Sequence, residues 1–107
     1  MLTKSELWEH IKSLEGQTIY TLKRPSPNKI LCVTDKAVVI EKREAKPSRK
    51  EISSLYRQVH ETGEVTVYNA RQWAWAVTYA ILVEAVPDEI EVIPGNRLGI
   101  RLRRHST

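Results

Sequence analysis

The chain lacks several features that define common protein classes. It has one cysteine, Cys32, so no internal disulfide can form. Phenylalanine is absent, and glycine and proline number only 4 and 5 in 107 residues, which excludes collagen-like and low-complexity chains. Three scattered histidines leave no spacing typical of a zinc finger. The longest uncharged run, 72–83, is too short to cross a bilayer, so we expect no membrane partner.

What remains is the composition of a globular domain. Apolar residues make up 41% and charged residues 28% of the chain, and 107 residues is a common size for one hydrophobic core. We therefore expect a single domain, 1–107, with a front half (1–46) and a back half (47–107). The first residues, Met-Leu-Thr-Lys-Ser-Glu, do not resemble a secretory signal, so we expect a cytoplasmic protein.

Positive charge is concentrated in two segments. Lys and Arg number 17, against 13 Asp and Glu. Residues 17–47 carry seven basic and three acidic side chains, and residues 89–107 carry four and two. Clustered Lys and Arg are typical of proteins that bind polyanions, because they displace counterions from phosphates. The alternative is a charged surface that only keeps the protein in solution.

The front half predicts a helix followed by a three-stranded antiparallel meander. Thr3 and Glu6 fit a capping box, and apolar residues at helical spacing predict a helix that ends at Gly16. Two prolines predict a loop over 23–29. Because the strands are apolar at nearly every position, we expect either that both faces of this sheet are covered or that the sheet curls strongly. The helix is expected over 4–15 and the strands over 17–22, 30–34 and 37–41.

The back half predicts two helices and a β-hairpin. Ser48 can cap a helix that ends at Thr62-Gly63. A short element over 66–70 leads to a second helix over 71–86, which is apolar nearly all round. The segments 89–93 and 97–103 alternate between apolar and polar residues and predict a two-stranded ribbon. The apolar stripe of the first helix consists of Ile52, Leu55, Tyr56 and Val59.

This order of helix, Thr62-Gly63 turn, short element, apolar helix and ribbon resembles a winged helix-turn-helix domain. The full chain is also similar to small modules found beside restriction and mobile-element genes in bacteria and phages. The resemblance implies an α+β, winged-helix-like fold that binds duplex DNA, with the second helix in the major groove and the ribbon as the wing. The implied base-reading residues are Asn69, Arg71 and Gln72, and the implied phosphate contacts of the wing are Arg97, Arg101, Arg103 and Arg104.

The second helix also suits a different role. It is almost uncharged beyond its first turn and contains Trp73 and Trp75. A helix that lies in a DNA groove is expected to present a polar or basic face. The Trp-rich helix is therefore equally consistent with a core helix, a homodimer seam or a docking surface for a larger protein.

The ribbon likewise has an alternative account. With a three-residue loop at its end, Glu91 lies opposite Arg101 and Glu89 lies opposite Arg103. Such cross-strand ion pairs would engage Arg101 and Arg103, two of the four arginines of the expected wing. Arg97 and Arg104 would remain free.

A second basic surface is predicted in the front half and the connector that follows it. A short apolar meander with a basic loop is typical of small curled sheets that bind nucleic acid. Tyr20 could offer a stacking face, although packing is the more common role of a strand tyrosine. The basic residues of this surface are Lys23, Arg24 and Lys29 in the proline-containing loop, and Lys46, Arg49 and Lys50 in the connector.

Catalytic motifs are absent from the sequence, apart from one incomplete set. Asp35 followed by Glu44-Ala45-Lys46 is similar to the Asp…Glu-x-Lys pattern of metal-dependent nucleases, in which two carboxylates hold Mg²⁺. Here the Glu-x-Lys segment lies among charges and before Pro47, which favours a loop. Cys32 lies between apolar residues and is expected to be an inert thiol. We therefore expect no enzyme activity, no cofactor and no metal.

The leading hypothesis is a non-catalytic module that binds nucleic acid, most simply duplex DNA, through its phosphates. A protein-docking or homodimerisation module that uses the Trp73/Trp75 helix is the second hypothesis, and a Mg²⁺-dependent nuclease is the third. The first hypothesis requires that the separate basic segments meet on one face of the folded chain.

Overall fold

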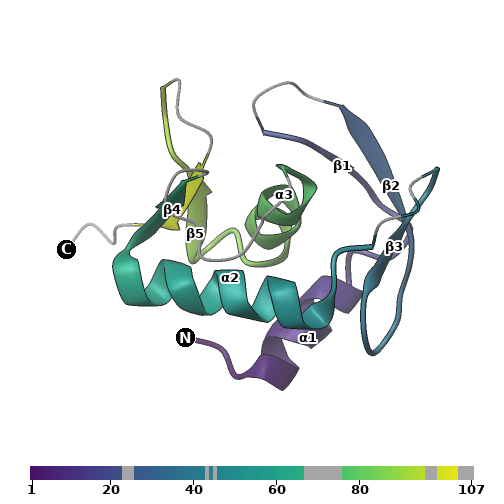
Figure 1. Ribbon diagram of the computed structural model, residues 1–107, viewed down its shortest axis with the longest axis horizontal. Coiled ribbons are helices and arrows are strands. Elements are labelled where there is room, and N and C mark those ends of the chain that lie inside the picture. The colour runs from purple at the N-terminus through teal and green to yellow at the C-terminus, as the bar shows by residue number, and fades with distance from the viewer. Residues whose placement is uncertain (23–25, 43, 45, 67–75, 96–98, 104–107) are drawn as a thin grey trace.

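The computed structural model describes residues 1–22, 26–42, 44, 46–66, 76–95 and 99–103. Within these residues the chain is a mixed α+β fold with three helices and two small antiparallel sheets (Figure 1). None of the described helices is long and apolar enough to span a membrane. The elements in chain order are α1 (Lys4–Lys12), β1 (Thr18–Tyr20), β2 (Pro27–Val33), β3 (Val38–Ile40), α2 (Arg49–Thr62), β4 (Glu64–Thr66), α3 (Ala76–Ala85), β5 (Ile90–Val92) and β6 (Gly99–Leu102).

Helix α1 begins at the predicted capping box. The Thr3 hydroxyl accepts a hydrogen bond from the Glu6 backbone N–H, and the Glu6 carboxylate accepts one from the Thr3 N–H. The helix is shorter than predicted and ends at Lys12, and tight turns then lead to Gly16, whose φ of 86° suits glycine. Its buried face carries Leu7, Trp8 and Ile11.

The front sheet has the predicted meander order β1-β2-β3. The predicted loop over 23–29 is wrong in its second part, because β2 already begins at Pro27, opposite Tyr20. Proline is tolerated as the first residue of a strand, where its missing N–H leaves no ladder bond unmade. Of the two alternatives for this sheet, the coverage of both faces is wrong. Tyr20 is 58% exposed and Leu31 48% exposed, so neither side chain packs into the core.

Helix α2 and the second sheet form most of the back half. Ser48 caps α2 by accepting a hydrogen bond from the Glu51 N–H, and Gly63, with φ of 85°, ends the helix. All four residues of the predicted stripe of α2 are buried. The sheet has the order β4-β6-β5, so the ribbon predicted from the sequence gains a third strand, β4, which lies between α2 and α3 in the chain and pairs with β6.

Helix α3 lies at the centre of the molecule (Figure 1). It contacts both other helices and the strands β1, β5 and β6. Residues 77–82 are at most 3% exposed, and among residues 77–85 only Glu84 is exposed. One hydrophobic core joins the two halves of the chain. The described part of this helix is thus a core helix, as one of the sequence interpretations expected. Trp73 and Trp75 lie outside the described residues.

Candidate nucleic-acid interface

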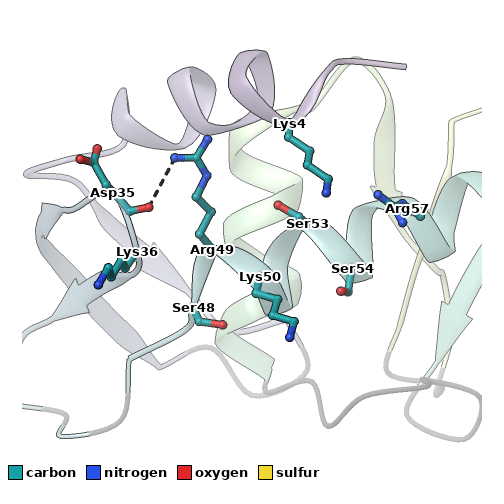
Figure 2. Close-up of a pocket in the computed structure, with 9 residues that line it drawn as sticks. All are labelled: Lys4, Asp35, Lys36, Ser48, Arg49, Lys50, Ser53, Ser54 and Arg57. Atoms are coloured by element: carbon teal, nitrogen blue, oxygen red, sulfur yellow. Dashed lines mark hydrogen bonds between the residues drawn. The ribbon is translucent and has the colours of Figure 1, made fainter.

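A strongly charged concave surface lies where α1, the turn between β2 and β3, and the first half of α2 meet. It is a cleft of about 550 Å³, large enough for a small ligand or a piece of a larger one. Figure 2 shows its lining side chains, which come from three separate parts of the chain. They are Lys4 of α1, Asp35 and Lys36 of the turn, and Ser48, Arg49, Lys50, Ser53, Ser54 and Arg57 of α2 and its cap. We call this surface the α1–α2 cleft.

The formal net charge of the residues that line the α1–α2 cleft equals that of the whole chain. Five basic side chains and one carboxylate line it, a formal surplus of four positive charges. The chain as a whole has a net charge of +4, so basic and acidic residues are equal in number outside the cleft. The single carboxylate of the cleft, Asp35, lies 3.7 Å from the ammonium of Lys12, which does not line the cleft. This ammonium offsets part of the negative charge of Asp35. An anion that enters the cleft therefore meets a nearly uniform positive surface.

Arg49 is held in place on the wall of the cleft. Its guanidinium lies over the indole ring of Trp8, 5.3 Å from the ring centroid, and its Nη1 lies 3.4 Å from the backbone carbonyl oxygen of Asp35. The indole is fixed in turn, because its Nε1 donates a hydrogen bond of 2.9 Å to the carbonyl oxygen of Thr34. In Figure 2 the Arg49 side chain extends from α2 toward α1. This arginine is therefore ordered before any ligand arrives.

The other basic side chains of the cleft are free to meet a ligand. Among the described residues, Lys4, Lys36, Lys50 and Arg57 have no carboxylate within salt-bridge distance, and all four are exposed. The backbone donors at the start of α2 are largely used, since the Arg49 N–H bonds to the carbonyl oxygen of Lys36 and the Glu51 N–H bonds to Ser48. Recognition in the cleft therefore falls to side chains: ammonium, guanidinium and serine hydroxyl groups, all of which donate to phosphate oxygens.

A partly buried polar cluster holds α2 against the chain just before β5. The Tyr56 hydroxyl donates to a Glu89 carboxylate oxygen at 2.7 Å and accepts from the Leu2 N–H at 2.8 Å. His60 Nε2 lies 3.1 Å from the same carboxylate oxygen. Burial and the hydrogen bond to Glu89 raise the pKa of Tyr56 to about 12. The cluster joins the N-terminal segment, α2 and the chain before β5, and so holds the helix that carries most of the cleft.

The structure brings together only part of the predicted nucleic-acid surface. Of the predicted contacts in the connector, Arg49 and Lys50 line the cleft. Lys29 on β2 and Lys46 before Ser48 are exposed but do not line it. Arg101 and Arg103 of the ribbon are described and lie outside the cleft. Seven predicted contacts lie outside the described residues: Lys23, Arg24, Asn69, Arg71, Gln72, Arg97 and Arg104.

Three basic residues of the cleft were missed by sequence reasoning: Lys4, Lys36 and Arg57. For Arg57 a signal was available, because Lys50, Ser53, Ser54 and Arg57 follow one another at helical spacing opposite the buried stripe of α2. No sequence pattern places α1 and the β2–β3 turn beside this helix face. That placement depends on Trp8 of α1, whose ring contacts Arg49 of α2 and whose N–H bonds to Thr34 of the β2–β3 turn.

Two arginines of the ribbon, Arg101 and Arg103, are engaged within its described residues. Arg101 lies opposite Glu91, as predicted, and its Nη2 is 2.8 Å from the Glu91 carboxylate. Arg103 differs from the prediction. Its N–H bonds to the Glu89 carbonyl oxygen, but its guanidinium donates to the carbonyl oxygen of Pro87 and lies 3.6 Å from Glu91, since the Glu89 carboxylate is held by Tyr56. Both arginines are thus less available to phosphates than the cleft residues.

The three named residues of the nuclease-like set, Asp35, Glu44 and Lys46, are all exposed in the structure. Asp35 lies in the exposed turn beside Lys12, and Glu44 and Lys46 are exposed in the connector before α2. In the described ranges of the chain, no three His, Cys, Asp or Glu side chains come together as a metal site. Cys32 is partly buried in β2.

Comparison with known proteins adds no assignment to this geometry. The chain matches no known protein family, no curated protein and no solved structure.

Proposed function

We propose that the protein binds nucleic acid, with duplex DNA as its polyanion, through phosphate contacts in the α1–α2 cleft. One observation carries the proposal: five basic side chains from three separate parts of the chain converge on one cleft that holds a single carboxylate. Duplex DNA carries one negative charge for about every 1.7 Å of its axis, so a compact patch of this kind gains several counterion-releasing contacts.

The chemistry of the cleft favours the backbone of the nucleic acid over its bases. Its lining consists of Lys, Arg and Ser side chains with one Asp, and includes no aromatic ring on which a base could stack. Charged and hydroxyl donors fix a protein on phosphates but carry no sequence information. Residues 77–82 of α3 are buried, so in this proposal they do not enter a groove. Binding is therefore expected to depend on salt far more than on sequence.

The test is the salt dependence of binding to a fluorescent duplex, measured by fluorescence anisotropy. With about four phosphate contacts, the slope of log K against log salt is expected near −3.6, which corresponds to roughly 100-fold weaker binding at 200 mM than at 50 mM salt. The double variant Lys36→Gln/Arg57→Gln should make this slope less negative by about 1.8.

A matched control removes the same charge elsewhere. Lys29→Gln/Lys46→Gln neutralises two exposed lysines that do not line the cleft, and we expect it to change the slope by less than about 0.5. Equal effects of the two double variants would show that net charge and not the cleft drives binding. No retention of any duplex at 50 mM salt would refute the proposal altogether.

A further inference from the structure

The α1–α2 cleft is long and narrow. Its lining along α2 runs from Ser48 to Arg57, and an α-helix rises about 1.5 Å per residue, so the cleft follows about 13.5 Å of this helix. A volume of about 550 Å³ spread over that length gives a cross-section of roughly 40 Å², which corresponds to a width of about 6 Å. The cleft is therefore a channel that runs beside α2.

The length of the cleft matches the backbone of one strand. A strand carries one phosphate per roughly 3.4 Å of duplex axis, so about four consecutive phosphates face this length of helix. Their negative charges equal the formal surplus of four positive charges in the lining. Lys50, Ser54 and Arg57 follow one another at helical spacing and form a row of donors in the same direction. One strand thus balances the charge of the cleft along its whole length.

The width of the cleft leaves no room for a second backbone. In B-form DNA the two backbones are separated by a minor groove about 6 Å wide or a major groove about 12 Å wide. A surface that contacts both strands has to span a groove together with the backbones on its two sides. The cleft is only about as wide as the minor groove alone.

The concave shape also argues against a helix that reads a groove, because such a helix has to project from the protein. The row of donors on α2 is instead flanked by α1 and by the β2–β3 turn, which contribute Lys4 and Lys36 to the same concave lining. Figure 2 shows Lys4 extending from α1 toward α2. A lining of this shape surrounds one backbone, and base edges at the bottom of a groove stay out of its reach.

We infer that the α1–α2 cleft holds the backbone of a single strand, which runs along α2 between Lys50 and Arg57, and that neither the complementary strand nor the bases are needed. The inference rests on the proposed function and names the substrate class of the same site, a single polynucleotide backbone, either free or as one strand of a duplex. Duplex DNA then binds through one of its two strands.

The experiment measures the binding of the full chain to three fluorescent ligands of equal length by anisotropy, between 50 and 200 mM salt. The first ligand is a strand of abasic deoxyribose phosphates, which has no bases and cannot form a duplex. The second is a duplex in which one strand has neutral methylphosphonate linkages, and the third is the same duplex with both strands charged.

The expected slopes of log K against log salt follow from four contacts to one strand. They are about −3.6 for the charged duplex and about −2.8 for the abasic strand, because a contact with a single strand contributes about 0.7. The half-neutral duplex has the charge of one strand, so its slope should also be about −2.8, or about 50-fold weaker binding at 200 mM than at 50 mM salt. A cleft that divided its contacts between two strands would keep only half of them on this duplex, with a slope of about −1.4 and about sevenfold weakening.

Two double variants complete the design. Lys50→Gln/Arg57→Gln removes the charged ends of the row and should make the slope for the abasic strand less negative by about 1.4. Lys29→Gln/Lys46→Gln removes two exposed charges that do not line the cleft and should change this slope by less than about 0.4. Thermal unfolding of each variant checks that it is folded.

The outcomes separate this inference from the proposed function. A slope of about −3.6 for the charged duplex together with about −1.4 for the half-neutral duplex would overturn the single-strand inference and leave the proposed function standing. Binding of the charged duplex without binding of the abasic strand would overturn the inference as well, because bases or duplex geometry would then be required. No binding of any of the three ligands would refute the proposed function and this inference together.

Discussion

Arg49 and Lys50 are adjacent in the sequence and line the same cleft, yet we expect their loss to have unequal effects on binding. Lys50 is exposed and must be ordered when it meets a phosphate, which costs about 0.5–1.5 kcal/mol for a flexible side chain. Arg49 is already held by the Trp8 ring and the Asp35 carbonyl. Its phosphate contact therefore retains about 1 kcal/mol more, a factor of roughly five in the dissociation constant.

The perturbations are Arg49→Gln and Lys50→Gln, each tested on the same fluorescent duplex. Each removes one phosphate contact, so each should make the salt slope less negative by about 0.9, which is about eightfold in affinity at 100 mM salt. In addition, Arg49→Gln should weaken binding about fivefold more than Lys50→Gln at every salt concentration. Arg49→Lys should retain most of the slope and lose much of the extra affinity, because an ammonium does not keep the planar stacking geometry.

Stability measurements separate binding from folding in this comparison. Loss of the contact between Arg49 and Trp8 is expected to lower the free energy of unfolding by about 1 kcal/mol, which leaves the domain folded. Thermal unfolding followed by circular dichroism checks this. If the folded Arg49 and Lys50 variants lose the same affinity, the reasoning from the ordered guanidinium is wrong.

Three further predictions concern the fold around the cleft. Tyr56→Phe should lower the free energy of unfolding by about 2 kcal/mol through loss of its bond to Glu89. The pKa of Tyr56 is about 12 in the folded protein and 10.0 ordinarily. Between pH 10 and pH 12 the free energy of unfolding of the parent, measured by denaturant titration, should therefore fall by about 2 kcal/mol more than that of the variant. Glu91→Gln should lower the free energy of unfolding by less than about 1 kcal/mol and leave the salt slope of DNA binding unchanged. The reason is that the ion pairs of Glu91 with Arg101 and Arg103 are half-exposed and lie outside the cleft. A steeper slope would place these arginines in the interface. Gly99→Ala should destabilise by about 2–3 kcal/mol in urea unfolding, because its Cβ would meet the backbone oxygen of Val65 on the paired strand, and a neutral effect would contradict the pairing of β4 with β6.

Local signals in the sequence were sufficient for the helices of the front and middle of the chain. Three local signals set the helix ends: a capping box at Thr3, a serine cap at Ser48 and a glycine stop at Gly63. Each signal acts within a few residues, so it can be recognised from neighbouring positions in the sequence. The alternation around Glu91 and Arg101 likewise fixed their pairing. Each of these features depends on short-range geometry alone.

Features that depend on contacts between distant segments were not predictable in the same way. The exposure of Tyr20 reflects which face of a short sheet the rest of the chain covers, and an apolar strand pattern does not specify that. The third strand of the second sheet, β4, pairs with a strand more than thirty residues away. The α1–α2 cleft is the same kind of feature, because only tertiary packing makes Lys4 and Lys36 line the same cleft as Arg57. Charge counts along the chain therefore indicated a polyanion ligand but not where it would bind.

The most direct test of the central claim is a map of the residues that respond to DNA. In a titration of the isotope-labelled chain with a short duplex at 50 mM salt, two-dimensional amide spectra should show the largest shift changes at Lys4, Lys36 and residues 48–57. The paired strands β5 and β6 should change little. Changes confined to β5 and β6, with no response along the cleft, would contradict the account.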